Sequence, residues 1–583
     1  MKSLVTIFRS HRQFFWLCVT LLFAGYGDRL AYAQEPALQP SPVQFDAPVL
    51  PEILPVESAP PPAESSVMPV ESGGGHPVQM QEYHHYSGPG STSFYAEPVQ
   101  YDPSVPEEHE PGIYKLTEGF LGTLGHPAEP IAKGFAKFLH TEHDEPHTEL
   151  DSHAIGIQPT PPRPDLLLQW NEEFLAPGFL DQGICTPTGA IWRPSLWVFG
   201  TYRTGVGYFD NGTANPVAEF ANRLDLFTQL NLSGTERILF GLRPLDEQQG
   251  SRRDFTGYDL RNGDERDGWN ADVQTLFFEG DFGELFPRLD WDEELSLDLG
   301  FSVGRQPISF QQGLLVNEDM IDALTVTRNT LNGNGNLNLR ATGVYAWNSV
   351  NRHSQAGTNV DDSDDQMIGL FTESDFSKST VNADVAYVWS DDGIDDLVAF
   401  GISSIRRFSG FHNTYNSSLH FLASFPTNGE TSLAGQGELL FSQLSWTPHH
   451  TNDLIFLNSF WAIDQFSSAS RGPLQGGPLG QTGLLFSAAG LGRYGAPLSN
   501  QASNVAGASL GYQMFFNDKR EQIVVELGGR QDTDDVNDAA IATGIRYQKA
   551  LDQHWLVVVD AFVGKRESRH VSQGARVELQ VKF

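Results

Sequence analysis

Apolar and polar residues alternate strictly in many short runs of the C-terminal two thirds of the chain. The last run, "ARVELQVKF", places Val577, Leu579, Val581 and Phe583 on one side and charged or polar residues on the other. A period of two residues predicts β-strands with one apolar and one polar face. Chain ends usually fray in water, so a regular terminal strand indicates that something holds both of its faces.

The same alternation recurs about 18 or 19 times between residues 195 and 583. Examples are "RLDLFTQLNL", "LSLDLGFSV", "LNLRATGVYAW", "TVNADVAYVW" and "WLVVVDAFV". This spacing leaves about 21 or 22 residues for each strand with its connection, and a membrane-barrel strand needs about 9–11. We expect loops where connectors are polar or rich in Gly and Pro, such as "ASRGPLQGGPLGQTG", and a tight turn at "FNDKREQ".

Two all-β architectures fit these strands. In a soluble sandwich the apolar faces of two sheets meet in a core, whereas in a membrane barrel they meet lipid and the polar faces line the lumen. Several apolar faces end in aromatic residues, as a membrane-interface girdle requires: Trp347, Trp389, Phe515, Phe516 and Phe583. We therefore predict a large antiparallel transmembrane β-barrel of about 18 strands over residues 195–583, located in the bacterial outer membrane and closed by pairing of its last strand with its first.

The N-terminal part of the chain has a different character. Residues 1–33 are predicted to be a signal peptide, with basic residues, the apolar stretch "FFWLCVTLLFAGYG" and a small-residue cleavage site "AYA" before Gln34. Residues 34–165 hold 23 of the 35 prolines and few periodic apolar positions, which predicts a Pro-rich, acidic, mostly disordered tether on the periplasmic side or at the surface. Residues 166–194 form the lead-in to the barrel.

Composition excludes several classes of protein. The formal net charge of −36 disfavours nucleic acid as a partner. We find no nucleophile elbow, paired-His motif or phosphate-binding loop, so we expect no enzyme, no catalytic residues and no cofactor. The sequences "HTEHDEPHTE" and "DDSDD" could bind zinc or calcium weakly, and we interpret both as solvated polar segments without a metal site.

A barrel of about 18 strands leaves an aqueous channel, so its functional residues should line the lumen. The candidates are arginines that lie opposite the apolar faces of the strands. Guanidinium groups bind carboxylates with two parallel hydrogen bonds, so a row of them favours anions. They could equally pair with acidic residues of the same wall, such as Asp225, Glu526 and Asp560, and then only neutralise it. By this alternation, the candidate solute-conducting residues are Arg223, Arg243, Arg340, Arg530 and Arg546.

One stretch resembles a known family. "LDLGFSVGRQPISFQQGLL", followed by "DALTVTR", is similar to the alginate export family of outer-membrane β-barrel porins, with Gly304, Arg305, Gln306 and Arg328 at the matching positions. "LDLFTQLNLSGTERILFGLR" is similar to that family's first hairpin. The resemblance implies 18 antiparallel strands and an Arg-lined passage for a uronic-acid polysaccharide, and it adds Arg305 and Arg328 to the candidate solute-conducting residues. Arg305 has the parity of lipid-facing Val303, so a lumenal Arg305 requires a bulge, a position past the strand end or another assignment.

The leading hypothesis is an outer-membrane channel for an anionic polysaccharide or its fragments. The alternatives are a general or carbohydrate-uptake porin for small hydrophilic solutes, and a structural outer-membrane anchor for the Pro-rich tether. The expected partners are outer-membrane lipid, the barrel assembly machinery, the transported solute and, through the tether, peptidoglycan or another envelope component.

Overall fold

The computed structural model describes fifteen stretches of the chain between residues 163 and 583. They are 163–175, 182–213, 215–249, 252–289, 297–331, 335–353, 359–362, 365–390, 393, 395–410, 413–449, 451–472, 474–517, 519–534 and 538–583. The predicted signal peptide and nearly all of the predicted tether lie outside these residues.

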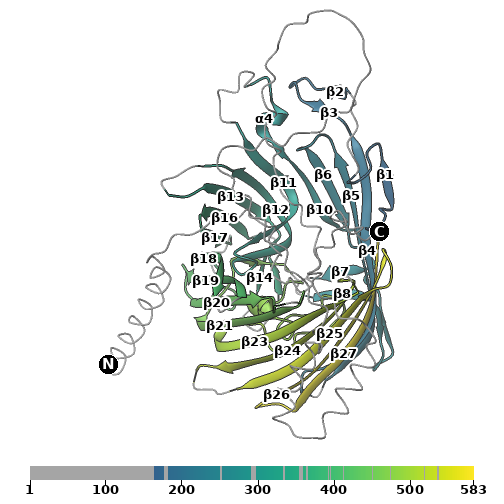
Figure 1. Cartoon of the computed structure of the whole chain (residues 1–583), viewed down its shortest axis with the longest axis vertical. Helices are drawn as coiled ribbons and strands as arrows, with labels where there is room; N and C mark the ends of the chain where they lie inside the picture. The colour runs from purple at the N-terminus through teal and green to yellow at the C-terminus, as the bar shows by residue number, and fades with distance from the viewer. Residues whose placement is uncertain are drawn as a thin grey trace, which may run out of the picture. The chain divides into compact units, whose positions relative to one another are not determined.

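Within the described residues, 18 strands form a closed antiparallel barrel (Figure 1). They are β4 (Ser195–Asp210), β5 (Val217–Asn231), β6 (Arg237–Leu242), β10 (Val273–Asp281), β11 (Leu299–Phe310), β12 (Val316–Arg328), β13 (Asn338–Asn348), β16 (Gln366–Phe376), β17 (Ser379–Trp389), β18 (Leu397–Gly410), β19 (Asn413–Pro426), β20 (Gly437–Trp446), β21 (Leu454–Gln465), β23 (Ser503–Phe516), β24 (Glu521–Asp532), β25 (Ala540–Ala550), β26 (Trp555–Arg566) and β27 (Val571–Lys582).

The remaining elements are short and belong to the lead-in or to connections. They are β1 (Leu168–Trp170), β2 (Ile184–Cys185), β3 (Ile191–Trp192), β7 (Asp246–Gln249), β8 (Arg252–Asp259), β9 (Asp264–Arg266), β14 (Val350–His353), β15 (Asn359–Asp362), β22 (Ser470–Arg471), the helix α4 (Phe282–Leu285) and the 3-10 helix η2 (Pro478–Thr482). In the described part of the chain, no helix is long and apolar enough to cross a membrane.

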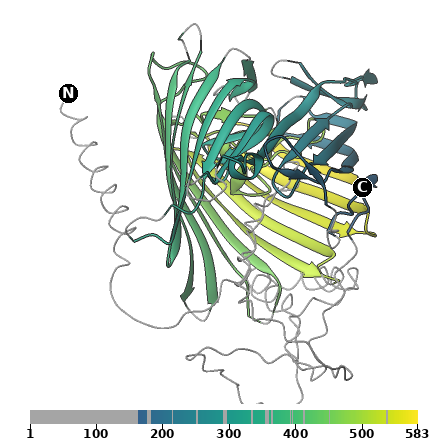
Figure 2. The same ribbon diagram turned by 90° about the horizontal axis from the view of Figure 1, so that it is seen from above.

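The last strand closes the barrel against the first. β27 pairs antiparallel with β4, from Gln573 opposite Asp210 to Lys582 opposite Thr201. Figure 2 shows the strands following one another around the barrel, from blue through green to yellow. This pairing explains the regular C-terminal strand, because β26 and β4 occupy its two edges.

The apolar side of the strands is the exposed side. On β5, Arg223 and Asp225 are buried, and the leucines that alternate with them face outward; on β27, Glu578 is fully buried and Val577 is 55% exposed. A soluble sandwich would bury its apolar faces instead. Outward Leu, Val and Ile over a closed barrel require hydrocarbon around them, so the protein lies in the bacterial outer membrane.

Aromatic side chains flank the aliphatic belt at both ends. At one end Tyr345 and Trp347 of β13 are exposed, and Tyr387 and Trp389 stack at the end of β17. At the other end, Phe408, Tyr415 and Trp446 form a chain of ring contacts across β18, β19 and β20. The prediction that Phe515 belongs to the aromatic girdle is wrong. Phe515 follows the inward-facing Gln513 by two residues, and side chains two residues apart on a strand face the same side.

The two rims of the barrel differ in the length of their connections. We call the rim where β4 begins and β27 ends the terminal rim, and the opposite one the loop rim. Terminal-rim connections such as 377–378 and 551–554 are short, whereas loop-rim connections include 243–272 and 466–502. Outer-membrane barrels have short periplasmic turns and longer external loops, which places the terminal rim in the periplasm.

Three loop-rim connections fold back into the barrel and pack against its inner wall in that half of the lumen. They are the tip of β11–β12, the hairpin β14–β15 and the connection 466–502, which we call the constriction segment. Leu315, Val350 and Phe486, one from each, have no exposed surface and belong to one apolar cluster with inward residues of the wall, among them Met367, Val388, Leu422 and Leu439. On β13 to β21 the wall is therefore apolar on both sides near the loop rim, since it faces lipid outside and a packed core inside.

Candidate functional site

Ion pairs cover the inner wall in two groups, one from β25 to β4 and the other from β5 to β12. Arg546 and Asp560 are opposite each other on β25 and β26, with 2.7 Å between Nε and Oδ1, and Arg576 on β27 binds the same carboxylate at 2.5 Å. Arg576 also forms an ion pair with Glu578. The Glu578 carboxylate forms a second ion pair with Arg203 of β4, with 2.6 Å between Nε and Oε1. Alternating charges of opposite sign on the inward positions of adjacent strands make this network.

The second group joins β5, the residue just past β6, and β12. Arg223 binds Asp225 at 2.8 Å, and Arg243 just past β6 reaches both Asp225 at 2.8 Å and Asp319 of β12 at 2.6 Å. All four side chains are buried. The predicted inward arginines Arg223, Arg243 and Arg546 thus bind carboxylates of the wall itself, and their charge is compensated there.

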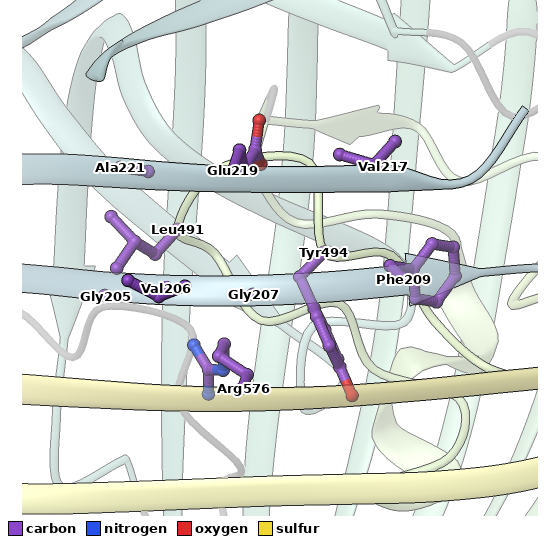
Figure 3. Close-up of a pocket in the computed structure, with 10 residues that line it drawn as sticks. All are labelled: Gly205, Val206, Gly207, Phe209, Val217, Glu219, Ala221, Leu491, Tyr494 and Arg576. Atoms are coloured by element: carbon purple, nitrogen blue, oxygen red, sulfur yellow. The ribbon is translucent and has the colours of Figure 1, made fainter. Parts of the chain in front are cut away.

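The constriction segment rests on glycines of this wall. A Cβ atom added at Gly205 of β4 would lie 3.2 Å from Leu491, and one added at Gly528 of β24 would lie 3.1 Å from Leu485. Figure 3 shows Leu491 and Tyr494 against the strand that carries Gly205 and Gly207. The space between them is about 10 Å³, too small for a solute. Inward glycines therefore leave room for the segment to pack closely on the wall.

Charged groups of the wall also bind the backbone of the segment. Arg203 and Arg223 donate to the carbonyl oxygens of residues 489 and 490 at 3.1 and 3.2 Å. The Glu526 carboxylate accepts from the N–H groups of residues 484 and 485 at 2.6 and 3.1 Å, and Arg530 donates to the carbonyl of residue 499 at 2.5 Å. Two of the predicted arginines, Arg223 and Arg530, thus hold the segment in the lumen.

Arg493 fixes the segment near the loop rim. Its guanidinium donates to Glu219 at 3.0 Å and to Asp259 at 2.6 Å. Because Asp259 receives this hydrogen bond from Arg493, its pKa falls from 3.8 to about 2. Arg493 was not among the predicted residues, because its role depends on the segment lying inside the barrel.

The tip of β11–β12 is the second inserted part. Gln311 and Gln312 have positive φ angles of 56° and 52°, a strained conformation for residues other than glycine. Their amide groups lie 3.0 Å from the two ring nitrogens of buried His420. Buried Arg471 of β22 donates to carbonyl oxygens of residues 313, 476 and 477, so it joins the tip to the constriction segment. Burial lowers the pKa of Arg471 to about 10.

The three other predicted arginines lie away from this network. Arg305 keeps the outward parity of Val303, since the register shift comes only after Gln306, and it binds Asp322 with two hydrogen bonds of 2.9 Å. Arg328 ends β12 with outward parity. Arg340 faces inward near the terminal rim, 4.0 Å from Glu373, and its side chain is 39% exposed.

A cavity of about 250 Å³ opens at the loop rim between the constriction segment and the ends of β25, β26 and β27. Phe209 and Ile541 supply apolar lining, and Lys565, Arg566 and Arg569 supply positive charge. Arg566 binds Asp538 at 2.7 Å, which compensates part of that charge. The cavity can hold one solute of a few hundred daltons at the external mouth.

Comparisons with known proteins give a distant likeness of fold. No protein-family model matches the chain, and no curated protein sequence is significantly similar to it. Similar solved structures include OccK11 (OpdR) of Pseudomonas aeruginosa (10% identity, TM-score 0.44, covering 66% of this chain and 96% of that one), OccAB3 of Acinetobacter baumannii (9%, 0.45, 67% and 99%) and a BenF-like porin of Pseudomonas fluorescens Pf-5 (9%, 0.46, 67% and 98%). Likeness this weak gives no information about solute or mechanism.

Proposed function

We propose that the chain is an outer-membrane channel for small hydrophilic solutes, with a lumen narrowed by the constriction segment. The observation that carries this proposal is the polarity of the wall from β24 through β27 to β5, which is apolar outside and charged inside and holds the constriction segment. A barrel of this strand number encloses an aqueous lumen unless something fills it. The constriction segment then limits the size of the solutes that pass, and the charged groups at the external mouth set the preference for their charge.

Anions are the favoured solute class. The cavity at the external mouth carries Lys565, Arg566 and Arg569, and Asp538 neutralises only part of their charge. Its volume of about 250 Å³ fits a single sugar acid or small organic acid, and a polymer would have to displace the constriction segment. Mouth charges raise the local concentration of an oppositely charged solute before it enters the lumen.

The second candidate is passage of an anionic polysaccharide, as in the alginate export family. The run of arginines from β25 to β6 favours it, because a polyuronate could bind them in turn if the constriction segment left the lumen. Compensation of Arg223, Arg243 and Arg546 by wall carboxylates argues for the small-solute channel instead.

Conductance in planar lipid bilayers separates these functions. The small-solute channel predicts low single-channel conductance, a reversal potential that favours anions in a KCl gradient, and block by glucuronate. Arg569→Gln is expected to reduce the anion preference, while Arg261→Gln, on an exposed loop of the same rim, leaves it unchanged. Transport of long polyuronate chains would instead establish the second candidate, and a folded barrel without conductance would favour an anchor for the tether.

A further inference from the structure

The lead-in of the barrel is bound to the seam between its first and last strands. β4 extends past the end of β27. The last residues paired between the two strands are Lys582 and Thr201. Just beyond them, Phe583 exchanges two backbone hydrogen bonds with Gly200. β1 pairs with the edge of β4 that lies beyond this point, and Trp170 is opposite Leu196. Residues 168–170 therefore continue the sheet where the last strand has ended.

Side-chain contacts hold the lead-in in this position. Trp197 of β4 donates through Nε1 to the carbonyl of residue 172 at 2.7 Å and packs edge-on against Phe174, with ring centroids 5.0 Å apart. Gln553 donates to Asp165 at 3.0 Å from the β25–β26 turn. Contacts on both sides of the seam give the lead-in one defined orientation.

That orientation gives β1 one lipid-facing side. Residues opposite each other in a sheet project on the same face, so Leu168 lies on the face of Val198 and Trp170 on the face of Leu196. Both partners alternate with inward residues of β4 and belong to the outward belt. Leu168 is 48% exposed and Trp170 is 57% exposed. The apolar face of β1 is thus continuous with the lipid-facing surface, at the periplasmic rim.

We propose that residues 163–175 form an interfacial anchor that inserts Leu168 and Trp170 into the periplasmic leaflet of the outer membrane. Tryptophan is enriched at membrane–water interfaces, where its ring contacts acyl chains and its N–H remains hydrated. Glu172 and Glu173 follow the strand and keep the far end of the segment at the aqueous side. The anchor holds residues 163–175 at the periplasmic surface of the membrane, independently of any solute that passes the barrel.

Site-specific fluorescence in lipid vesicles tests this anchor. In the full chain with Cys18 and Cys185 replaced by serine, an environment-sensitive dye is attached at Leu168→Cys, with Val198→Cys as the lipid-facing reference and Glu173→Cys as the aqueous control. We expect the dye at 168 to emit at shorter wavelength than the dye at 173 and to be quenched by brominated phosphatidylcholine, as at 198. Quenching of the dye at 168 by iodide, and not by brominated lipid, would overturn the proposal.

A second variant keeps the test independent of the label. Trp170→Ala is expected to increase cleavage by a Glu-specific protease at Glu172 and Glu173 severalfold, while the heat-dependent electrophoretic shift of the folded barrel remains. Unchanged cleavage in vesicles would contradict the anchor. Conductance of Trp170→Ala is expected to match the unsubstituted protein, so failure of the anchor and failure of the channel function are distinguished.

Discussion

Arg203 on the first barrel strand and Glu578 on the last are joined by a buried ion pair, with 2.6 Å between Nε and Oε1. The pair crosses the seam that closes the barrel. Its two residues are 375 positions apart in sequence, so the bond forms only when the ends of the barrel have met.

Removing one partner of this seam pair is expected to destabilise the barrel. Glu578→Gln leaves the Arg203 guanidinium buried without its carboxylate, which costs about 3–5 kcal/mol. The measurement is the free energy of unfolding in urea with the protein in lipid vesicles. The matched control is Glu373→Gln, because the Arg340–Glu373 pair is exposed and 4.0 Å apart, and such pairs contribute about 0–1 kcal/mol. Equal losses in the two variants would contradict a special role of the seam.

A larger residue at Gly528 is expected to displace the constriction segment. An added Cβ would lie 3.1 to 3.3 Å from Leu485, Leu498 and Phe486, so Gly528→Val overpacks this contact and costs about 1–3 kcal/mol. We expect single-channel conductance to increase. Gly343→Val is the control, since a Cβ at Gly343 meets no atom within 4 Å. An unchanged conductance with Gly528→Val would show that the segment does not limit the passage.

Leu527→Arg tests whether lipid covers the outer face. Leu527 is 52% exposed and lies near the middle of β24, where a soluble protein would tolerate arginine. At the middle of a bilayer, the same change costs about 2–4 kcal/mol. Thr213→Arg, at the loop rim, is the control with an expected cost near zero. The free energy of unfolding in vesicles measures both, and a neutral Leu527→Arg would refute the membrane-facing assignment.

Acid is expected to release the loop-rim end of the constriction segment. The folded-state pKa of Asp259 is about 2, below its ordinary 3.8, because Arg493 donates a hydrogen bond to it. A depressed pKa stabilises the folded state above the ordinary value, and this stabilisation is lost as the pH falls from about 4 to about 2. We expect hydrogen–deuterium exchange of the backbone around Arg493, corrected for the intrinsic exchange rate and measured by mass spectrometry, to become faster in that window. Asp259→Asn should already show faster exchange around Arg493 at pH 7 and a smaller change with pH.

The outward and inward faces were predictable from sequence, and the contents of the lumen were not. Alternation of Leu224 and Leu226 with Arg223 and Asp225 is local information, and the closed barrel with its outward leucines confirms it. The contact of Arg203 with the carbonyl of residue 489 joins positions 286 apart, which parity cannot reveal. One sequence signal for the inserted segment was the glycine at position 528, which faces inward within a strand. Glycine inside a strand often marks a place where another part of the chain approaches closely.

Arg305 illustrates the limit of motif reasoning. The resemblance around Gly304 and Gln306 suggested a lumenal arginine, while parity with Val303 indicated the opposite side. The register shift between Gln306 and Ile308 comes too late to turn Arg305 inward, and Asp322 opposite it carries the compensating charge. Local alternation was the better guide at this position, because it follows directly from strand geometry.

The groups that hold the constriction segment come from both ends of the barrel sequence, Arg203 and Arg223 near its beginning and Glu526 and Arg530 near its end. The docking place for residues 484–499 is thus assembled only after the ring of strands is complete. A substitution that kept the last strand from meeting the first would therefore also separate the two sets of groups that hold this segment.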